Sequence, residues 1–393
     1  MRVATIFGVG VACASLVDLP AKWPTPNGKE VQLLGHRGLK SQMPEHTLGS
    51  YWLAATAGAD YVEPDVVLTK DNVPVCFHNL YIRDGTDVEK FAKFSSRRRN
   101  FTGELDGKPT TIENEYFISD FTVAELKELR VVQKEVGVRP QYFNELFQIP
   151  TLEEFLEEMV TAADKLGRPI NIAPELKHPV YHNSLFPCVR FEDHVLQVLQ
   201  RHGYALKRNH RPRKGRGKLM LQSFDFESLK YLRTKVDLGV VDLVMLNDDD
   251  PYFFTRAGLE ELSKHANWLG PWKEYLYLNP KEQFDGSKTK YNSSQVDEWG
   301  GFLSKCEVVR IAHRLGLKIV LYTFYDSREK SQRGCAIGCE SEDARAEYTY
   351  YFSMGIDALF VENIGEAIQA RTEYNTKLWA RIAPELTCPS RFY

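Results

Sequence analysis

Residues 31–78 read VQLLGHRGLKSQMPEHTLGSYWLAATAGADYVEPDVVLTKDNVPVCFH and contain three predicted strands and one predicted helix. Val31–Gly35, Tyr61–Val67 and Val73–Phe77 have the apolar character of buried strands, which is typical of parallel sheets covered on both faces. Thr47–Ala57, between the first two, has helical periodicity and the length of a crossover helix. A strand, a helix and a parallel strand form the repeating unit of α/β folds.

The rest of the chain continues this alternation of strands and helices. Further strands are predicted at 170–173, 219–222, 241–246, 318–322 and 358–361, and further helices at 152–165, 191–201, 303–315 and 345–353. Eight strands with helices between them predict a (β/α)8 TIM barrel. A doubly wound sheet is the alternative, but no glycine-rich phosphate loop follows the first strand.

The connection between the second and third predicted strands is too short for this pattern. Only residues 68–72 separate the two strands, and a helical crossover needs a dozen residues or more. Either the crossover helix is missing, or the pair is locally a hairpin and one barrel strand comes from elsewhere in the chain.

The composition excludes several function classes. With 43% hydrophobic residues among 393, the chain can bury a large core, which excludes an intrinsically disordered protein. The formal net charge is −3, so there is no general basic excess of the kind that binds nucleic acid. No segment approaches the roughly 20 apolar residues that a membrane-spanning helix requires.

The N-terminus, MRVATIFGVGVACAS, has the pattern of a secretory signal peptide. One arginine, a short apolar run and small residues predict cleavage after residue 14, whereas a short buried strand is the structural alternative. We therefore expect a secreted protein, or one in the secretory pathway or a periplasm. Six cysteines remain after cleavage, and their disulfide pairing is open, although Cys76 in an apolar strand is expected to be a buried free thiol.

Two polar stretches fall outside the barrel pattern. Residues 79–148 are rich in turn residues and are predicted to be an insertion between early barrel strands that covers or shapes a site. Residues 207–218, KRNHRPRKGRGK, predict either a solvated loop or a weak contact with a polyanion or with phospholipid headgroups. The barrel is thus expected to span 31–370, followed by a tail at 371–393.

Charged and polar side chains follow the predicted strands at their carboxyl ends, where barrel enzymes place their active sites. Burial of such groups is unfavourable unless they are paired or bind a metal. Along the chain they are His36 and Arg37, Glu63 and Asp65, His78, Glu175 and Lys177, Gln222, Asn247, Thr323 and Glu362. Because these strand ends meet at one mouth, we expect most of these side chains to form a single site.

Three of the predicted mouth residues are carboxylates. Glu63 and Asp65 alternate with Pro64 and so face the same side, where they repel one another unless a cation or a proton lies between them. A structural salt bridge to Arg37 is one explanation. Together with Glu175, the pair forms an oxygen site that suits Ca²⁺ or Mg²⁺, and we favour Ca²⁺ because exported proteins meet it in abundance.

The remaining mouth residues complete a set suited to phosphodiester cleavage. His36 and His78 can act as general base and general acid. Arg37 and Lys177 supply positive charge for a phosphate, and the guanidinium fork matches phosphate oxygens. Metal, base, acid and phosphate clamp together indicate metal-assisted cleavage of a phosphodiester.

The stretch from LGHRG to CFHN closely resembles the opening of the glycerophosphodiester phosphodiesterase family, which shows HRG, PENT, an E-x-D strand and a T-x-D-G-x-P-V-x-x-H-D turn and strand. The resemblance continues through IPTLEEFLE, IAPELKHPVYHN, LQSFDFESL, IVLYTFYD and AEYTYYFSMGIDALFVENIGEAI, and so covers most of residues 31–370. The insertion and the PELKHPVYHN segment look most like the plant and bacterial periplasmic branch.

The resemblance implies a (β/α)8 barrel and hydrolysis of a small glycerophosphodiester to glycerol 3-phosphate and an alcohol, with water or the substrate's own C2 hydroxyl as nucleophile. It places the metal ligands at Glu63, Asp65 and Glu175, the catalytic histidines at His36 and His78, the phosphate-contacting arginine at Arg37, and further binding-site matches at Glu45 and Lys177. From their strand positions we add Gln222 and Tyr322 as candidate substrate contacts, with Phe324 and Phe360 as candidates for packing the glycerol or the alcohol.

The chain departs from the family pattern at four positions near this site. Asn79 follows the second histidine in place of aspartate, and His46 replaces the asparagine of PENT. Tyr322 stands where many members have tryptophan, and Glu362 where aspartate is common. None of these removes a metal ligand or a catalytic histidine.

Two other functions are compatible with the same scaffold. A sphingomyelinase D-like phospholipase shares the two histidines and the E-x-D strand, but that family is shorter and lacks a long insertion. A catalytically inactive, exported binding protein on a decayed barrel is the other alternative. The presence of all five key groups, the two histidines and the three carboxylates, argues against it.

Overall fold

The structure is a computed structural model and describes residues 23, 25–287, 290–326 and 345–376. The predicted signal peptide, residues 1–14, lies outside the described residues. Most of the predicted tail also lies outside them, and the last helix runs from Ile364 to Asn375, past the predicted domain boundary at residue 370.

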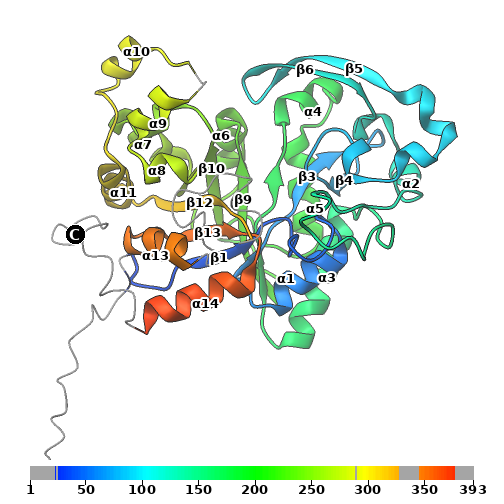
Figure 1. The fold of residues 1–393 in the computed structure, drawn as a ribbon, viewed down its shortest axis with the longest axis horizontal. Helices are drawn as coiled ribbons and strands as arrows, with labels where there is room; N and C mark the ends of the chain where they lie inside the picture. Colours follow the sequence, from blue (N-terminus) through cyan, green and yellow to red (C-terminus); the bar gives the residue numbers. More distant parts are fainter. Residues whose placement is uncertain (1–22, 24, 288–289, 327–344, 377–393) are drawn as a thin grey trace, which may run out of the picture.

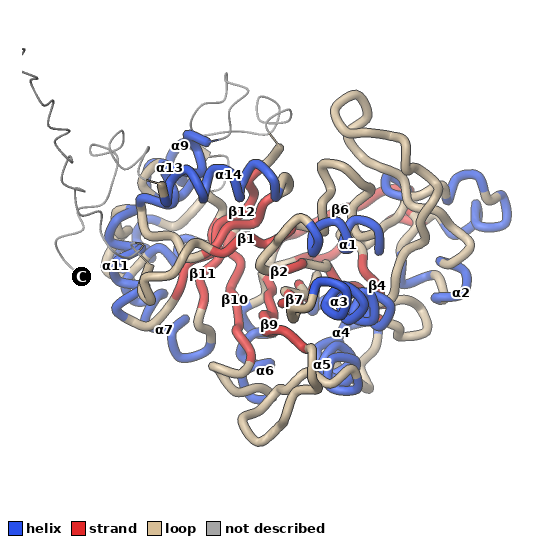
Figure 2. The backbone as a smooth tube through the Cα atoms, turned by 90° about the horizontal axis from the view of Figure 1, so that it is seen from below, coloured by secondary structure: helices blue, strands red, loops and turns tan. Residues whose placement is uncertain are grey.

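Eight parallel strands close into a ring, with helices around it (Figure 2). Each strand pairs with its neighbour in chain order, and β13 pairs with β1 to close the ring. The ring strands are β1 (Gln32–Gly35), β2 (Tyr61–Val62), β7 (Ile170–Ile172), β9 (Arg216–Ser223), β10 (Val241–Asn247), β11 (Trp268–Pro271), β12 (Lys318–Phe324) and β13 (Ala358–Val361). The predicted (β/α)8 barrel is confirmed.

Helices lie around this ring (Figure 1), and most of them bury apolar residues in the cluster on its outside. They are α1 (Leu48–Thr56), α3 (Leu152–Leu166), α4 (Pro179–Leu185), α5 (Phe191–Arg201), α6 (Phe226–Lys235), α7 (Arg256–His265), α8 (Glu274–Tyr277), α9 (Pro280–Gly286), α10 (Ser293–Glu298), α11 (Lys305–Arg314), α13 (Arg345–Ser353) and α14 (Ile364–Asn375). Within the described ranges, none of the helices is both long and apolar enough to cross a membrane.

The third predicted strand is not part of the ring. Residues 73–77 contain β4 (Pro74–Cys76), which runs antiparallel to β3 (Asp65–Leu68), so the hairpin alternative is correct. The chain reverses over residues 69–73, where Asn72 has a φ of 60°. The eighth strand comes from β11, which the sequence did not reveal because WLGP is short and contains glycine and proline.

Two ring strands are interrupted by a proline as they reach the mouth. Pro64 separates β2 from β3, and Pro174 separates β7 from β8 (Glu175–Leu176). A proline has no N–H for the sheet ladder, so the ladder is interrupted there and resumes beyond the break in the same register. Asp65 then pairs with Glu175, and Glu175 with Gln222, in one row across three strands.

The insertion, residues 79–148, has a hydrophobic core of its own beside the barrel (Figure 1). That core includes Phe94, Phe117 and Phe121, and it extends to Val75 and Phe77 of the β3–β4 hairpin. Its elements are η1 (Arg83–Gly85), η2 (Val88–Lys90), η3 (Ala92–Arg97), β5 (Arg99–Leu105), β6 (Lys108–Glu115), η4 (Ile118–Asp120) and α2 (Val123–Leu126). One further 3₁₀ helix, η5 (Pro251–Phe254), follows β10.

The inside of the barrel is filled by a separate apolar cluster, so the ring is a packed core and not a pore. Phe360 belongs to this cluster, and Phe324 packs against Tyr348 at 0% exposure. Both side chains are buried in the core. Cys76 is a buried free thiol, as predicted, and Cys188 is an exposed free cysteine.

Candidate active site

The loop after β1, residues 36–47, carries five of the site residues: His36, Arg37, Lys40, Glu45 and His46. Arg37 and His46 both have positive φ, 59° and 56°, and the His46 N–H donates to the Arg37 carbonyl. Gly38 has a φ of 88°, and a Cβ there would lie 2.3 Å from the Ser50 hydroxyl. The loop therefore depends on glycine at this position.

The three predicted carboxylates lie together at the mouth. Glu63, Asp65 and Glu175 each place one oxygen so that all three oxygens are within 4.8 Å of one another, and all three side chains are buried. The proline breaks bring them together, because Glu63 and Asp65 flank Pro64 and Glu175 follows Pro174.

The charge of this triad fits a bound divalent cation. Burial, together with the neighbouring carboxylates, raises the pKa of Glu63 well above its usual range. Burial also raises the pKa of Glu175 to about 8, with Asp65 adding to the effect. Three carboxylate oxygens at this spacing are the hard ligands that Ca²⁺ and Mg²⁺ prefer, and a cation would offset the repulsion between them.

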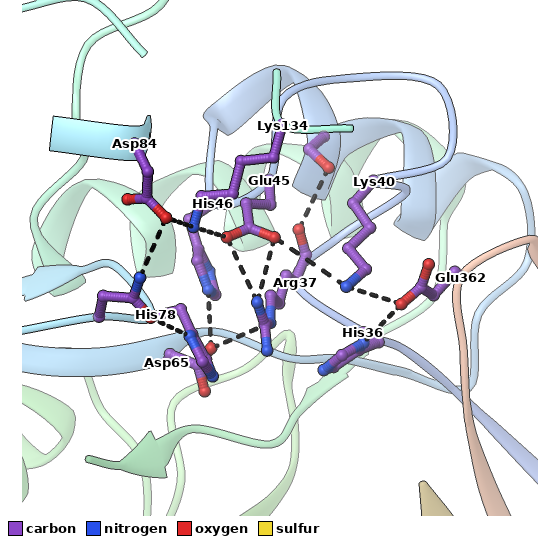
Figure 3. Close-up of polar contacts among 12 residues, drawn as sticks. His36, Arg37, Lys40, Glu45, His46, Asp65, His78, Asp84, Lys134 and Glu362 are labelled. Atoms are coloured by element: carbon purple, nitrogen blue, oxygen red, sulfur yellow. Dashed lines mark hydrogen bonds and ion pairs between the residues drawn. The ribbon is translucent and has the colours of Figure 1, made fainter. Parts of the chain in front are cut away.

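Arg37 connects the triad to the loop after β1. Its backbone N–H donates to Glu63 Oε2 at 2.6 Å, and its Nε lies 3.3 Å from Asp65 Oδ2. Its Nη1 donates to both oxygens of Glu45, at 3.1 and 3.3 Å (Figure 3). Glu45 therefore holds the guanidinium of Arg37.

His36 is held from behind by a carboxylate. Its Nδ1 lies 3.3 Å from Glu362 Oε1, which also accepts a contact from Lys40 Nζ at 2.6 Å (Figure 3). Burial, with the charges of Lys40 and Arg37, lowers the pKa of His36 to about 3, although Glu362 opposes the shift. Neutral His36 therefore keeps Nε2 as a proton acceptor on the side away from Glu362.

His78 is held in the same way by a neutral group. Its Nδ1 lies 2.6 Å from Asn79 Oδ1, and Asn79 Nδ2 donates to Asp84. Its Nε2 lies 3.4 Å from Lys177 Nζ, whose ammonium is 2.8 Å from Glu175. Burial, followed by the charges of Arg37 and Lys177, lowers the pKa of His78 well below its usual range.

His46 contacts Asp65, one residue of the carboxylate triad. Its Nε2 lies 2.8 Å from Asp65 Oδ2 and its Nδ1 lies 2.8 Å from the Tyr51 hydroxyl, with only 1% of the His46 side chain exposed. The histidine that replaces the family asparagine is thus a buried partner of a candidate metal ligand.

A groove of about 720 Å³ opens beside His78 and Lys177. Its other walls are the β5–β6 turn of the insertion and the segments that follow β9 and β10. The turn is fixed there, because Asp106 contacts His178 at 2.8 Å and Lys108 contacts Asp249 at 2.8 Å.

Some predicted site residues have mainly structural contacts. The Gln222 amide donates to the Ala173 carbonyl at 2.9 Å, next to Glu175 in register. Asn247 bonds the backbone of Asp250 and so shapes the loop after β10. Tyr322 packs its ring against Phe224, whose ring lies under the Lys177 ammonium. Thr323 is buried in the same strand.

The basic stretch 207–218 lies away from the site. It enters β9 at its amino end, Arg216, whereas the site is at the carboxyl end of that strand, next to Gln222. A phospholipid contact of this stretch remains a prediction.

Three site residues were missed by the sequence reasoning. Lys40 is 3% exposed and contacts Glu362. Lys134 and Arg139, from the insertion, contact Glu45 at 2.9 Å and Glu362 at 3.0 Å. Lys40 lies between the HRG and PEH motifs, but no motif marks Lys134 or Arg139. Only the need of the buried carboxylates Glu45 and Glu362 for cationic partners could have suggested these cations.

Comparisons with known proteins agree on one family. The model described as "Glycerophosphoryl diester phosphodiesterase family" matches residues 36–366. Among curated proteins, the glycerophosphodiester phosphodiesterase GDPD6 of Arabidopsis thaliana is 27% identical over 380 residues, covering 90% of this chain and 91% of the relative. The glycerophosphodiester phosphodiesterase of Haemophilus influenzae is 30% identical over 308 residues, covering 70% of this chain and 77% of the relative.

A solved structure shares the barrel. A phosphodiesterase of Oleispira antarctica, described in complex with its product sn-glycerol-3-phosphate, has a TM-score of 0.51 and 19% sequence identity. The alignment covers 88% of this chain and 98% of that one.

Proposed function

We propose that this chain, which belongs to the glycerophosphoryl diester phosphodiesterase family and is a phosphodiester hydrolase, cleaves glycerophosphodiesters to glycerol 3-phosphate and an alcohol. His36 and His78 would be the acid–base pair. Glu63, Asp65 and Glu175 would hold a divalent cation. The proposal extends to an exported protein, because the N-terminus has the pattern of a signal peptide.

One observation carries the proposal: two histidines with fixed rings and a partly buried arginine surround a triad of carboxylates. Nδ1 of His36 lies against Glu362, and Nδ1 of His78 lies against Asn79, so each ring presents Nε2. The side chains of His36 and Arg37 are 14% and 15% exposed, so a small phosphodiester can reach them.

Arg37 and Lys177 would bind the phosphodiester. Both are charged groups next to the triad, and a phosphate in contact with them exchanges its hydration shell for fixed donors. The groove beside His78 and Lys177 gives the alcohol portion a place to lie. The negative charge of the bound substrate also offsets the positive charges that depress the pKa of His78.

The two histidines would move the protons. One Nε2 accepts a proton from the nucleophile, either water or the C2 hydroxyl of the glycerol moiety. The other histidine donates a proton to the departing alkoxide. Each such acid or base group typically raises the reaction rate by about 10²–10⁴-fold. A cation held by the triad supplies Lewis acidity toward a phosphate oxygen.

Hydrolysis of several glycerophosphodiesters, followed as release of glycerol 3-phosphate, tests this function. We expect turnover with Ca²⁺ or Mg²⁺ and loss of turnover after exhaustive chelation, with recovery when the cation is returned. Turnover that survives chelation would contradict the metal site. Sphingomyelin in the same assay separates a sphingomyelinase D-like enzyme, and a chain that binds Ca²⁺ without turning over any substrate would be an inactive binding protein.

A further inference from the structure

The insertion sends one loop back to the barrel mouth. Residues 131–147, here named the insertion strap, are closed at their base by hydrogen bonds from the Val131 N–H to the Phe147 carbonyl and from the Glu145 N–H to the Val131 carbonyl. The strap is also tied to the loop after β1, because the Gln133 side chain donates to the carbonyls of Lys40 and Met43 at 3.0 and 2.9 Å.

Lys134 of the strap reaches the carboxylate that holds Arg37. Its Nζ lies 2.9 Å from Glu45 Oε1, while Glu45 Oε2 accepts from Arg37 Nη1 at 3.1 Å (Figure 3). The carboxylate is thus fixed between a strap cation and a mouth cation. Glu45 is 5% exposed, so water cannot easily replace either partner.

Arg139 of the strap reaches the carboxylate that holds His36. Its Nη2 donates to Glu362 Oε2 at 3.0 Å, while the other oxygen, Oε1, faces His36 Nδ1 at 3.3 Å and Lys40 at 2.6 Å. The side chains of Arg139 and Glu362 are 2% and 0% exposed. Arg139 therefore occupies one oxygen of Glu362 and leaves the other directed at the histidine.

The same arrangement occurs twice, on two different residues of the mouth. In each case a strap cation and a mouth side chain share one buried carboxylate. We propose that the insertion strap is a positioning element in which Arg139 orients His36 through Glu362 and Lys134 orients Arg37 through Glu45. This inference rests on the proposed function, because it assigns those two mouth residues to proton transfer and phosphate binding.

The two strap cations should then affect different kinetic constants. Loss of Arg139 frees Glu362 to rotate and displaces His36, which acts in the chemical step, so kcat falls. Small displacements of a catalytic group cost up to about 10²-fold. Loss of Lys134 loosens Arg37, which binds phosphate before and during the reaction, so KM rises and kcat changes less.

After removal of either strap cation, the buried carboxylate that it contacted still has another cationic partner. Without Arg139, Glu362 keeps Lys40, and without Lys134, Glu45 keeps Arg37. Uncompensated buried charge is the main reason why such substitutions unfold proteins, and neither variant creates it on these carboxylates.

The experiment is steady-state kinetics on the full chain carrying Arg139→Met or Lys134→Met, with Arg139→Lys and Lys134→Arg as charge-retaining rescues. Arg201→Met and Lys281→Met are matched controls, because both cations pair with carboxylates at the surface, at 66% and 63% exposure. Glycerophosphocholine is the probe, and Ca²⁺ binding by calorimetry and thermal unfolding are measured on every variant.

We expect Arg139→Met to lower kcat by about 10²-fold with KM nearly unchanged, and Arg139→Lys to restore part of the loss. Lys134→Met should raise KM several-fold, and Ca²⁺ affinity should stay at the wild-type value. Equal kinetics in wild type and Arg139→Met, or equal effects on kcat and KM in both Met variants, would overturn the proposal. If Arg139→Met does not fold, Arg139→Lys must still show the kcat effect.

The same measurements separate this proposal from the proposed function. A wild-type chain that turns over glycerophosphocholine while the strap variants match it overturns only the positioning role. A folded wild-type chain that turns over no glycerophosphodiester overturns both.

Discussion

The ring of barrel strands and the insertion build the same mouth in different ways. Ring residues such as Glu63 and Glu175 stand on strand ends whose backbone is fixed by pairing with neighbouring strands. Strap residues such as Lys134 and Arg139 stand on an irregular loop, and their charges meet buried carboxylates of the mouth. The ring and the β3–β4 hairpin therefore supply the proposed reactive groups, and the insertion adds charges that hold the partners of His36 and Arg37.

The largest expected effect tests the ring side of this contrast. His36→Ala should lower kcat by about 10²–10⁴-fold, because it removes one of the two acid–base groups. His194→Ala, on helix α5, is the control and should match wild type. Release of glycerol 3-phosphate measures both, and a change in kcat below threefold for His36→Ala would remove this residue from the mechanism.

A substitution in the hydrophobic core of the insertion tests the other side of this contrast. Phe117 is fully buried in the insertion cluster, and Phe117→Ala should cost about 3–5 kcal/mol. We expect hydrogen exchange to rise within 79–148 and activity to fall because the strap is released, while the ring stays protected. Phe155→Ala, in the cluster around the ring, should destabilise the barrel instead. The same exchange pattern in both variants would show that the two regions unfold as one.

Loss of the contact between His46 and the carboxylate triad should have an intermediate effect. His46→Phe keeps the ring shape but loses the contacts with Asp65 and Tyr51, so divalent-cation affinity should fall about 10–100-fold. Titration calorimetry with Ca²⁺ measures this directly, and His46→Gln should retain more affinity than His46→Phe. Unchanged affinity would mean that the pairing with neighbouring strands alone fixes Asp65.

A smaller effect concerns pH. Burial opposes ionisation of Glu362, yet Lys40, His36 and Arg139 hold its pKa below the usual range. A carboxylate with a depressed folded-state pKa contributes stability above its unfolded pKa of about 4.3, and this contribution is lost as pH falls through the region below. The difference in unfolding free energy between wild type and Glu362→Gln should therefore shrink from about pH 5 downward. A difference that is constant down to pH 3.5 would contradict the shift.

The smallest effect is expected where the insertion meets the ring at the surface. Lys108→Met removes contacts of the β5–β6 turn with Asp248 and Asp249, which are 54% and 27% exposed. Exposed ion pairs contribute at most about 1 kcal/mol, so unfolding free energy should change by less than that. A larger loss of unfolding free energy in chemical denaturation would show that this turn contributes more to the contact between the insertion and the barrel.

Sequence reasoning recovered the ring and its strand ends, because strand periodicity and strand-end polarity are local signals. It left open whether Val73–Phe77 belongs to the ring or to a hairpin, since an apolar run does not report the direction in which its strand pairs. It missed β11, whose four residues include a glycine and a proline. Lys134 and Arg139 were out of reach because their partners, Glu45 and Glu362, are distant in sequence.

The β3–β4 hairpin has a consequence for how this enzyme can change over evolutionary time. His36 follows a ring strand, but His78 follows β4, and Val75 of that strand and the adjoining Phe77 pack into the insertion cluster. The two proposed proton-transfer groups therefore belong to different structural bodies, and their separation is set at the seam between them. Replacing or shortening the insertion would move one histidine against the other, so loss of the insertion should require a compensating change in the hairpin before the acid–base pair works again.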